Sequence, residues 1–459
     1  MNSARVPRAL LARYSRPIPR YTSYPTAPSW QDDLPAEVAR AQLDRAAADP
    51  GPLSLYAHLP FCKKLCFYCG CNMMVTRSST LVERYLAALL EEVRQAGERF
   101  AGRRQVVQLH WGGGTPTHLS VEQLGKLHGA LQQAFPFAPD AEQSIEVHPP
   151  VTTVEQVQAL AAMGFNRVSM GVQDFDPVVQ KAVNRPQPFE QTRDLIAACR
   201  QAGFCSVNVD LKYGLPHQNL ERFARTLELV GQLRPERVAL FGYAHLPALK
   251  PHQKLMPEAA LPAPEQRLEL FELAADTLAE QGYHYLGLDH FALKGDELQV
   301  AQEQRTLRRN FMGYTTKAGS DMLAFGSSAI SDLGPAFLQN AREVAGYISR
   351  VEGGQLAIDR GCLLTPDDLI RQAVIHDLFC VLELDPARLS ERLGIHFQSY
   401  FASELERLRP LAADGLVELA PDRIRVTPTG QVLLRNVAAV FDAHLGQPAL
   451  KAVQFSQAV

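Results

Sequence analysis

The sequence predicts an α/β protein built around a parallel sheet. From residue 53 onward, short runs of β-branched and other apolar residues alternate with segments of helical periodicity. Alternation over roughly 240 residues requires parallel strands joined by right-handed crossovers. Six strands are expected, fewer than the eight of a closed TIM barrel. The predicted strands are Leu53–His58, Val106–His110, Ser144–Val147, Arg167–Val172, Ser206–Leu211 and Val238–Tyr243.

Helices are expected between these strands. Leu81–Arg94 carries a single apolar stripe at positions 82, 86, 89 and 93. Pro264–Gln281 begins with a proline, which suits a first helical turn, and Gly282 follows as a stop signal. Because parallel sheets bind ligands beyond the carboxyl ends of their strands, we expect the functional residues there.

Composition indicates an ordinary globular protein of two or three domains, with 459 residues, 46% of them hydrophobic and 21% charged. A net charge of -3 and a pI near 6.5 give no signal for nucleic-acid binding. No apolar run approaches the roughly 18 residues of a membrane span. Eight cysteines without a secretory signal predict a cytoplasmic protein in a reducing compartment.

The N-terminal segment is basic, with five arginines and no acidic residue before Asp32. Such a composition is also typical of an organellar presequence. Prolines at positions 17, 19, 25 and 28 argue against the long amphipathic helix of a presequence. We therefore expect a solvated basic tail over most of Met1–Ser15, followed by an extended arm of the mature protein.

Four of the eight cysteines lie within ten positions, directly after the first predicted strand. Cys62, Cys66 and Cys69 have the spacing C-x3-C-x2-C. Three thiolates on one short loop can bind three irons of a [4Fe-4S] cluster and leave the fourth iron open. Cys71 lies too close to Cys69 to reach the far corner of that cluster.

Other roles of these cysteines remain as alternatives. A disulfide framework suits a small secreted chain, and a structural zinc ion normally takes a second pair of ligands. The remaining cysteines are scattered and unpaired along the sequence. Zinc binding and redox chemistry of the thiols stay open, and an iron–sulfur cluster is favoured.

The cysteine motif, with Tyr68 before the third cysteine, resembles that of the radical S-adenosylmethionine (SAM) enzymes. The wider segment Tyr56–Cys62, together with Cys71, resembles the oxygen-independent coproporphyrinogen III oxidase family, and this resemblance runs from Arg20 to near the C-terminus. It implies a partial, open (β/α)6 TIM-like barrel with an extended N-terminal arm and a mainly helical, winged-helix-like C-terminal domain. The expected parts are an arm (1–50), the barrel (51–300), a segment closing the substrate side (301–364) and a C-terminal lid (365–459).

Trp111–Thr117 follows the second predicted strand and contains three consecutive glycines. Such a segment brings the backbone close to a ligand and offers consecutive N–H donors to an anion. It is no phosphate-binding P-loop, because no Lys-Ser/Thr follows. By the resemblance, Gly113, Gly114 and Thr115 contact the methionyl amino group of SAM. Glu146, whose carboxylate can accept two hydroxyl hydrogen bonds, would hold the SAM ribose.

The resemblance implies further site residues. Gln173, Arg185 and Asp210 would lie near a second SAM molecule. The remaining implied contacts to the cofactors are Tyr56, Phe67, Ala244 and Ile330, and the implied catalytic residues are Tyr56, Glu146 and Ile330.

Four residues depart from the pattern of that family. His148 and Pro150 stand where aspartate and arginine are expected, so one charge of each sign is absent. Lys212 replaces an apolar residue, and an inward Lys212 would form an ion pair with Asp210. Met312 replaces a glutamine, and a thioether cannot make the amide's hydrogen bonds.

The C-terminal region reads as helical with one hairpin. Thr365 is a suitable helix N-cap, Leu416–Leu419 and Ile424–Thr427 form the predicted hairpin, and Gln431–His444 is the predicted last helix. This order resembles a winged helix and raises DNA binding as an alternative. Acidic residues among the arginines argue against it, so we expect a lid over the barrel.

The resemblance implies an anaerobic oxidase of haem biosynthesis. A reduced cluster would cleave SAM to a 5′-deoxyadenosyl radical, which would attack coproporphyrinogen III and convert two propionates to vinyls, giving protoporphyrinogen IX. An electron donor such as flavodoxin or ferredoxin, a monomeric state, and no nucleic-acid or membrane partner are expected. The alternatives are a paralogous radical SAM enzyme that acts on haem or transfers methyl groups, and a non-catalytic haem-binding or chaperone-like relative. The arm would lie over the active-site mouth, where its arginines can pair with propionates.

Overall fold

A computed structural model describes residues 5–317, 319–447 and 455–457. Its largest sheet has 13 strands, in the order β1-β17-β16-β15-β14-β2-β5-β6-β7-β8-β9-β11-β10. Seven neighbouring strands in the middle are parallel. They are β14 (Asp321–Phe325), β2 (Leu53–Leu59), β5 (Val106–Gly113), β6 (Phe137–Val147), β7 (Arg167–Gln173), β8 (Ser206–Tyr213) and β9 (Arg237–Gly242). All six predicted strands are confirmed, and β14 is a seventh that the sequence analysis missed.

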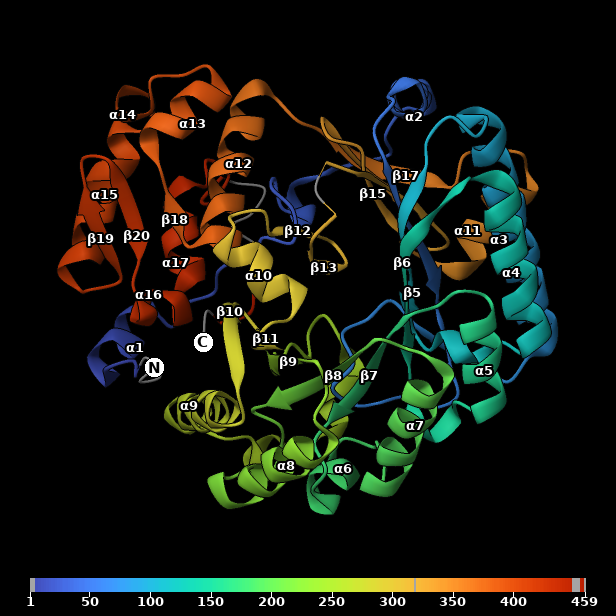
Figure 1. Ribbon diagram of the computed structural model, residues 1–459, viewed down its shortest axis with the longest axis horizontal. Coiled ribbons are helices and arrows are strands. Elements are labelled where there is room, and N and C mark those ends of the chain that lie inside the picture. The colour runs from blue at the N-terminus through green and yellow to red at the C-terminus, as the bar shows by residue number, and fades with distance from the viewer. Residues whose placement is uncertain (1–4, 318, 448–454, 458–459) are drawn as a thin grey trace.

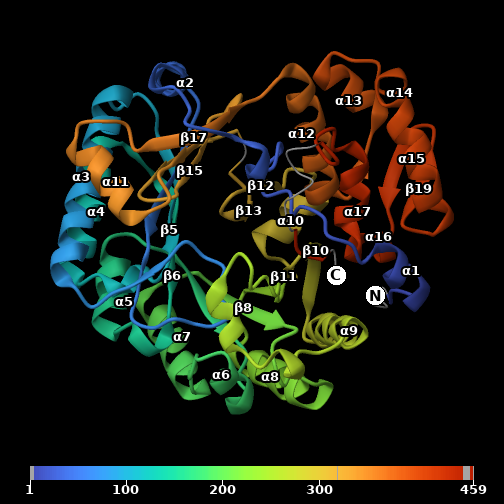
Figure 2. The ribbon, with the colours of Figure 1, turned by 180° about the vertical axis from the view of Figure 1, so that it is seen from behind.

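The parallel strands curve into an open barrel (Figures 1 and 2). Antiparallel strands flank them on both sides, and the two ends of the sheet do not pair with each other in the part of the chain that is described. One flank is β11 (His290–Leu293) and β10 (Tyr283–Gly287). The other is β15 (Ile330–Asp332), β16 (Ala336–Asn340), β17 (Ile358–Leu363) and β1 (Gln31–Asp32). The predicted fold class is therefore confirmed.

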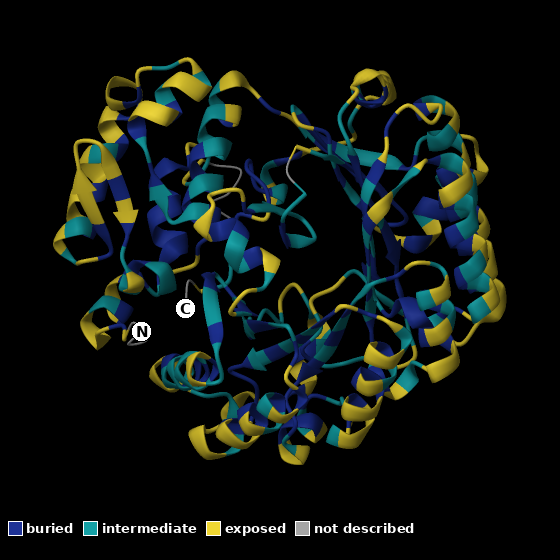
Figure 3. Cartoon of the chain, in the orientation of Figure 1, coloured by how far each residue is buried: buried dark blue, intermediate teal, exposed yellow. Residues whose placement is uncertain are grey.

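Helices cover the outer face of the sheet, with exposed outer sides and buried inner sides (Figure 3). The predicted helix Leu81–Arg94 lies within α3 (Ser79–Phe100), and the predicted Pro264–Gln281 is α9 (Pro264–Glu280). Ser78 caps α3 by accepting the Leu81 N–H, which satisfies one of the free donors of the first turn. The other covering helices are α2 (Ala36–Ala48), α4 (Val121–Ala134), α5 (Val154–Ala162), α6 (Pro177–Ala182), α7 (Phe189–Ala202), α8 (Leu220–Leu233) and α11 (Val344–Glu352).

The C-terminal part packs beside the open side of the barrel (Figure 1). Thr365 caps its first helix, as predicted, in a capping box with Asp368. The predicted hairpin is confirmed as β19 and β20. The elements of this part are α12 (Pro366–Val381), β18 (Glu383–Leu384), α13 (Pro386–Leu393), α14 (Phe397–Tyr400), α15 (Ala402–Ala413), β19 (Val417–Ala420), β20 (Arg423–Val426), α16 (Pro428–Val432) and α17 (Leu434–Ala438). Between it and the barrel lie α10 (Glu297–Glu303), β12 (Arg308–Asn310) and β13 (Gly313–Thr315).

The prediction of one continuous helix over Gln431–His444 is wrong. The segment forms α16, α17 and a 3-10 turn at Ala439–Phe441. The helix is interrupted at Leu433, whose φ of -99° and ψ of 22° depart from helical values. It ends before Asp442, which is extended and accepts the His444 N–H.

The prediction of a solvated tail is also wrong for the described part of Met1–Ser15, and residues 1–4 lie outside the description. Arg8–Tyr14 forms the short helix α1, in which Leu11 and Tyr14 are buried against the C-terminal part. The Tyr14 hydroxyl donates to Asp414 at 2.5 Å. From α1 the chain extends between the C-terminal part and the barrel to α2 (Figure 1).

A buried carboxylate joins α3 to the strands on the β14 side. Glu92 accepts hydrogen bonds from the Gly326 N–H, the Asn340 amide and the Tyr347 hydroxyl at 2.8, 2.7 and 2.6 Å. Burial nevertheless raises the pKa of Glu92 from 4.5 to about 7. The stability that this shift contributes is complete below about pH 4.5 and is lost as the pH rises through about 7.

We therefore expect the free energy of unfolding of the parent to fall across this pH window relative to that of Glu92→Gln, which cannot titrate. Urea unfolding followed by circular dichroism measures both. Glu91→Gln is the matched control, because Glu91 lies on the same helix and Arg94 lowers its pKa to about 2, outside the window. Identical pH dependence of the parent and Glu92→Gln would contradict the assignment.

Candidate active site

An open cavity of about 540 Å³ lies at the carboxyl ends of the parallel strands. The loop after β2, the loop after β5 and the ends of β6 to β9 all contribute to its wall. Most of the predicted site residues line it, namely Cys62, Cys66, Cys69, Gly113, Gly114, Thr115, Glu146, Gln173, Arg185 and Asp210. The strand ends thus bring these ten residues together from five separate segments.

The cysteine loop is held from both sides. It runs between the two-residue strands β3 (Phe61–Cys62) and β4 (Met74–Val75). The Asn184 amide donates to the Leu65 carbonyl at 2.8 Å, and the His252 ring lies 2.7 Å from the Cys69 carbonyl oxygen. The loop is therefore fixed at its backbone, while its thiols line the cavity.

The three thiols fit a cluster better than a single ion. All eight cysteines are free. In the described residues, no three His, Cys, Asp or Glu side chains converge at metal-binding distance. Ligands of a zinc ion converge on one point at about 2.3 Å, whereas cysteines of a cubane each bind a different iron and stand farther apart. The separate thiols on one loop thus agree with an iron–sulfur cluster.

Two polar groups reach the thiols directly. Arg185 Nη1 donates to Cys66 Sγ at 3.5 Å, and the Thr115 hydroxyl lies 3.6 Å from Cys62 Sγ. A side-chain hydrogen bond with Cys71 lowers the pKa of Cys69, while the same contact raises that of Cys71. Arg185 and Thr115 thus place a cation and a hydroxyl beside two of the three motif thiols.

Glu146 lies at the centre of the cavity wall. Its carboxylate accepts the Gly113 N–H at 3.1 Å and lies 3.6 Å from His110 Nε2. Burial in the barrel raises the pKa of Glu146, but His110, the Gly113 N–H and His58 outweigh it, so the net pKa is lowered. With 45% of its side chain exposed to the cavity, Glu146 is an ionised acceptor for a ligand.

The predicted nest of N–H donors in the glycine segment is wrong. Gly113 donates to Glu146, Gly114 to the Leu59 carbonyl at 2.9 Å, and Thr115 to the Phe61 carbonyl at 2.9 Å. Gly114 is required by packing, because a Cβ there would lie 2.5 Å from the Pro60 carbonyl oxygen. An amino group needs acceptors rather than N–H donors, so the expected contact with the SAM amino group does not depend on such a nest.

Three buried polar atoms of the cavity wall have no hydrogen-bond partner. They are His148 Nε2, Gln173 Oε1 and Arg185 Nε. Burial, followed by the charges of Arg185 and Lys64, lowers the pKa of His148 to about 2, so its ring is neutral. Buried polar groups are normally satisfied, so these three atoms are free to pair with a ligand in the cavity.

Lys212 points into the cavity, but the ion pair expected between it and Asp210 does not form between these two described side chains. Its ammonium instead lies 5.4 Å from the ring centre of Tyr68 and 5.2 Å from that of Phe241. Burial, then the charge of Glu146, raises the pKa of Asp210 to about 6, while Asn208 donates to it at 2.7 Å. The ammonium thus lies against two aromatic faces and forms no ion pair with a carboxylate of the described residues.

Four predicted site residues and Met312 are not among those that line this cavity. Tyr56 lies behind its wall, stacked on His110 with the ring centres 5.9 Å apart. Phe67 packs with Tyr68 and Val179 on the far side of the cysteine loop. The Ala244 carbonyl accepts a hydrogen bond from Gln253, Ile330 packs beside Trp30, and Met312 lies in the turn between β12 and β13. Their functional roles stay predictions.

Sequence reasoning missed two supporting residues. His110 orients Glu146 and is itself 2.5 Å from the Ser144 hydroxyl, and Phe241 lies under Lys212. Positions 110, 144 and 146 alternate along β5 and β6 towards the cavity, so strand periodicity could have found His110. No sequence pattern could have identified Phe241, because an aromatic residue at the end of a strand is expected in the hydrophobic core.

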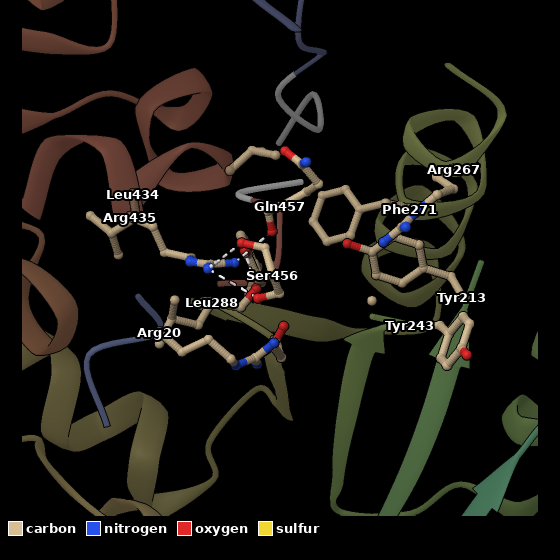
Figure 4. Close-up of a pocket in the computed structure, with 14 residues that line it drawn as sticks. Arg20, Tyr213, Tyr243, Arg267, Phe271, Leu288, Leu434, Arg435, Ser456 and Gln457 are labelled. Carbon is tan, nitrogen blue, oxygen red and sulfur yellow. Dashed lines mark hydrogen bonds and ion pairs between the residues drawn. The ribbon is translucent and has the colours of Figure 1, made fainter. Parts of the chain in front are cut away.

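The N-terminal arm reaches the cavity edge at Arg20. Its guanidinium forms an ion pair with Asp289 and lies 5.5 Å from the ring centre of Phe241. Burial, then the charges of Arg435 and Arg309, lowers the pKa of Arg20 to about 10. On its other side Arg20 faces a separate pocket, in which Arg435 donates to the Ser456 and Gln457 carbonyls (Figure 4). Arg20 thus already has a carboxylate partner, while the predicted meeting with propionates stays a prediction.

Comparisons with known proteins agree on one family. The "Radical SAM superfamily" description matches residues 56–230, and the "HemN C-terminal domain" description matches residues 364–433. The chain is 45% identical over 452 residues to the oxygen-independent coproporphyrinogen III oxidase of Escherichia coli (strain K12), with 98% of each chain covered. It is 43% identical over 454 residues to that of a Synechocystis species, covering 98% of this chain and 97% of the relative.

The solved structure of the Escherichia coli coproporphyrinogen III oxidase, described as a radical SAM enzyme, has the same fold. It superposes with a TM-score of 0.92 at 43% identity, covering 97% of this chain and 100% of that one. The similarity therefore extends through the arm, the barrel and the C-terminal part together.

Serine substitutions test which thiols bind iron. We expect Cys62→Ser, Cys66→Ser and Cys69→Ser each to abolish the iron content and visible absorbance of the anaerobically reconstituted protein, because each thiolate is the sole protein ligand of one iron. Cys71→Ser should keep the cluster, as should Cys205→Ser, an exposed thiol elsewhere. Loss of iron from Cys71→Ser as complete as from Cys66→Ser would disprove the assignment.

Proposed function

The chain belongs to the oxygen-independent coproporphyrinogen III oxidase family of radical SAM enzymes, and we propose that its barrel cavity is where coproporphyrinogen III is oxidised. The reaction removes a hydrogen atom from the β-carbon of a propionate side chain. Loss of CO2 and one electron then leaves a vinyl group. Two propionates react, and the product is protoporphyrinogen IX of haem biosynthesis.

One observation carries this proposal: the three free thiols of the loop after β2 and an ionised glutamate on β6 face the same cavity. Cys62, Cys66 and Cys69 would hold a [4Fe-4S] cluster, which together with SAM would supply the radical chemistry that takes the hydrogen atom. Glu146 accepts the ribose hydroxyls of that SAM. Its contact with His110 keeps it ionised and oriented for this role.

The remaining polar wall suits carboxylates and a second SAM. Arg185 offers its unpartnered Nε and Gln173 its unpartnered Oε1, and Asp210 lies on the next strand. Lys212 offers an ammonium with no carboxylate partner to a substrate that carries four propionates. The barrel, the arm and the C-terminal part together keep water away from the radical.

We also propose the conditions of the reaction. The enzyme acts as a monomer in the cytoplasm and receives its electron from a carrier protein such as flavodoxin or ferredoxin. Eight free cysteines support a reducing compartment. No helix among the described residues is long and apolar enough to cross a bilayer.

Product mass after anaerobic reconstitution and turnover tests the function. Coproporphyrinogen III should lose two CO2 with SAM cleavage. Gain of a methyl group, or ring opening of haem, would support the paralogue alternatives instead. Full-length similarity to named oxidases, the three cluster cysteines and the cavity favour the oxidase over these and over a non-catalytic relative.

Glu146→Ala tests the SAM site. We expect cluster assembly to persist and SAM binding to weaken by about 1.5–3 kcal/mol, the cost of losing a charged hydrogen-bond acceptor. Anaerobic calorimetry measures it, with the exposed Glu122→Ala on α4 as control. Unchanged affinity in Glu146→Ala would remove this carboxylate from the SAM site.

Lys212→Met tests whether Lys212 replaces the hydrogen bond that a glutamine at position 312 would make. Decarboxylation should fall about 10- to 100-fold, as for the loss of a charged hydrogen bond, while SAM cleavage without substrate persists. Met312→Gln should be tolerated. If Lys212→Met decarboxylates as fast as the parent, the compensation by Lys212 is refuted.

A further inference from the structure

The cluster loop (61–78) has two neighbouring segments on the surface of the protein. They are α6 with the chain after it (177–188) and the chain after β9 (244–257). We call the loop and these two segments the cluster rim. The Phe67 N–H donates to the Val183 carbonyl at 3.0 Å, which joins the loop to the second segment. His252 and Gln253 lie 2.7 and 3.3 Å from the carbonyl oxygens of Cys69 and Tyr68, which joins it to the third.

The cluster rim is basic and has no acidic residue within its three ranges, which are flanked by Asp176, paired with Arg222, and by Glu258. Its basic residues are Lys63, Lys64, Arg77, Lys181, Arg185, Lys250 and Lys254. All of them except Arg185 and Lys250 are exposed. The chain as a whole has a net charge of -3, so the concentration of positive charge at the rim is local.

The rim also exposes aliphatic side chains. Four of the ten large apolar residues that are exposed in the described chain lie there, although the rim is only about one tenth of the sequence. Leu249 and Leu255 are the two most exposed of all, at 59% and 61%, and Val75 and Val178 are 45% and 44% exposed. Exposed apolar residues within a charged surround are typical of a protein-binding surface.

We propose that the cluster rim is the docking surface for an acidic one-electron carrier protein. This inference rests on the proposed function, because it is the bound cluster that needs the electron. The positive charge of the rim favours an acidic partner. The exposed leucines favour a protein over a small anion, because only a protein surface would make apolar contacts with them. Docking there brings the carrier over the thiols of the cluster loop. The carrier loses one electron and the cluster gains it, with no other bond made or broken.

The test measures cluster reduction directly, with no substrate present. Reduced flavodoxin is mixed anaerobically with the reconstituted enzyme, and the loss of cluster absorbance gives the second-order rate constant. We expect Lys181→Glu/Lys254→Glu to lower this constant about tenfold and to flatten its decrease with salt. Leu249→Ser/Leu255→Ser should lower it without changing the salt dependence. Lys126→Glu/Lys294→Glu, with the same charge change on other surfaces, should match the parent.

Reduction by dithionite, which needs no docking, should proceed at the parental rate in every variant. The proposal would be overturned if flavodoxin reduced the parent and both rim variants at the same rate. It would also be overturned if the control substitutions lowered this rate constant as much as the rim substitutions do. A third outcome would also overturn the proposal. The parent would bind phosphatidylglycerol vesicles, the rim substitutions would abolish this binding, and the flavodoxin rates would stay unchanged. The surface would then be a membrane-binding surface. Failure of the proposed function appears separately, as a dithionite-reduced parent that does not decarboxylate coproporphyrinogen III.

Discussion

The contact between Glu146 and His110 is the interaction on which the site depends. It joins β6 to β5, and Tyr56 on β2 stacks on the same histidine. Space around it is fully used, because a Cβ at Gly112 would lie 3.1 Å from the Glu146 carboxyl carbon and 3.2 Å from the Tyr56 hydroxyl. His110 and the Gly113 N–H keep this half-exposed carboxylate ionised. The barrel therefore presents one ionised acceptor at a fixed place, opposite the cysteine loop.

The cysteine loop supplies the second fixed component by a different means. Its position comes from backbone carbonyls at Leu65 and Cys69, which Asn184 and His252 hold, so the thiols need no contacts of their own. Arg185 joins the loop to the end of β7, since it donates to both Cys66 Sγ and the Gly171 carbonyl. One side chain thus places a positive charge beside the Cys66 thiol and fixes the loop against the barrel.

Local patterns in the sequence were enough to predict the six barrel strands and the cysteine loop, whereas Glu146 at the end of β6 was singled out by the family resemblance. Features set by distant contacts were missed. The five-residue run of β14 has no distinguishing periodicity, and only its pairing with β2 makes it a parallel strand. The nest of free N–H donors was wrongly predicted for the glycine segment. Its sequence does not reveal that two of these N–H groups donate to the carbonyls of Leu59 and Phe61. Likewise, the aromatic rings around Lys212 come from segments far away in the chain, and the pattern suggested an ion pair instead.

Cys62, Cys66 and Cys69 would hold the cluster at the cavity that contains Glu146, so SAM bound in this cavity would reach an iron of the cluster. Electron paramagnetic resonance of the dithionite-reduced enzyme, with and without SAM, tests this most directly. A ligand on the open iron changes the electronic structure of the cluster, so saturating SAM should shift the g values of its signal. A spectrum that stays unchanged at saturating SAM would contradict the account.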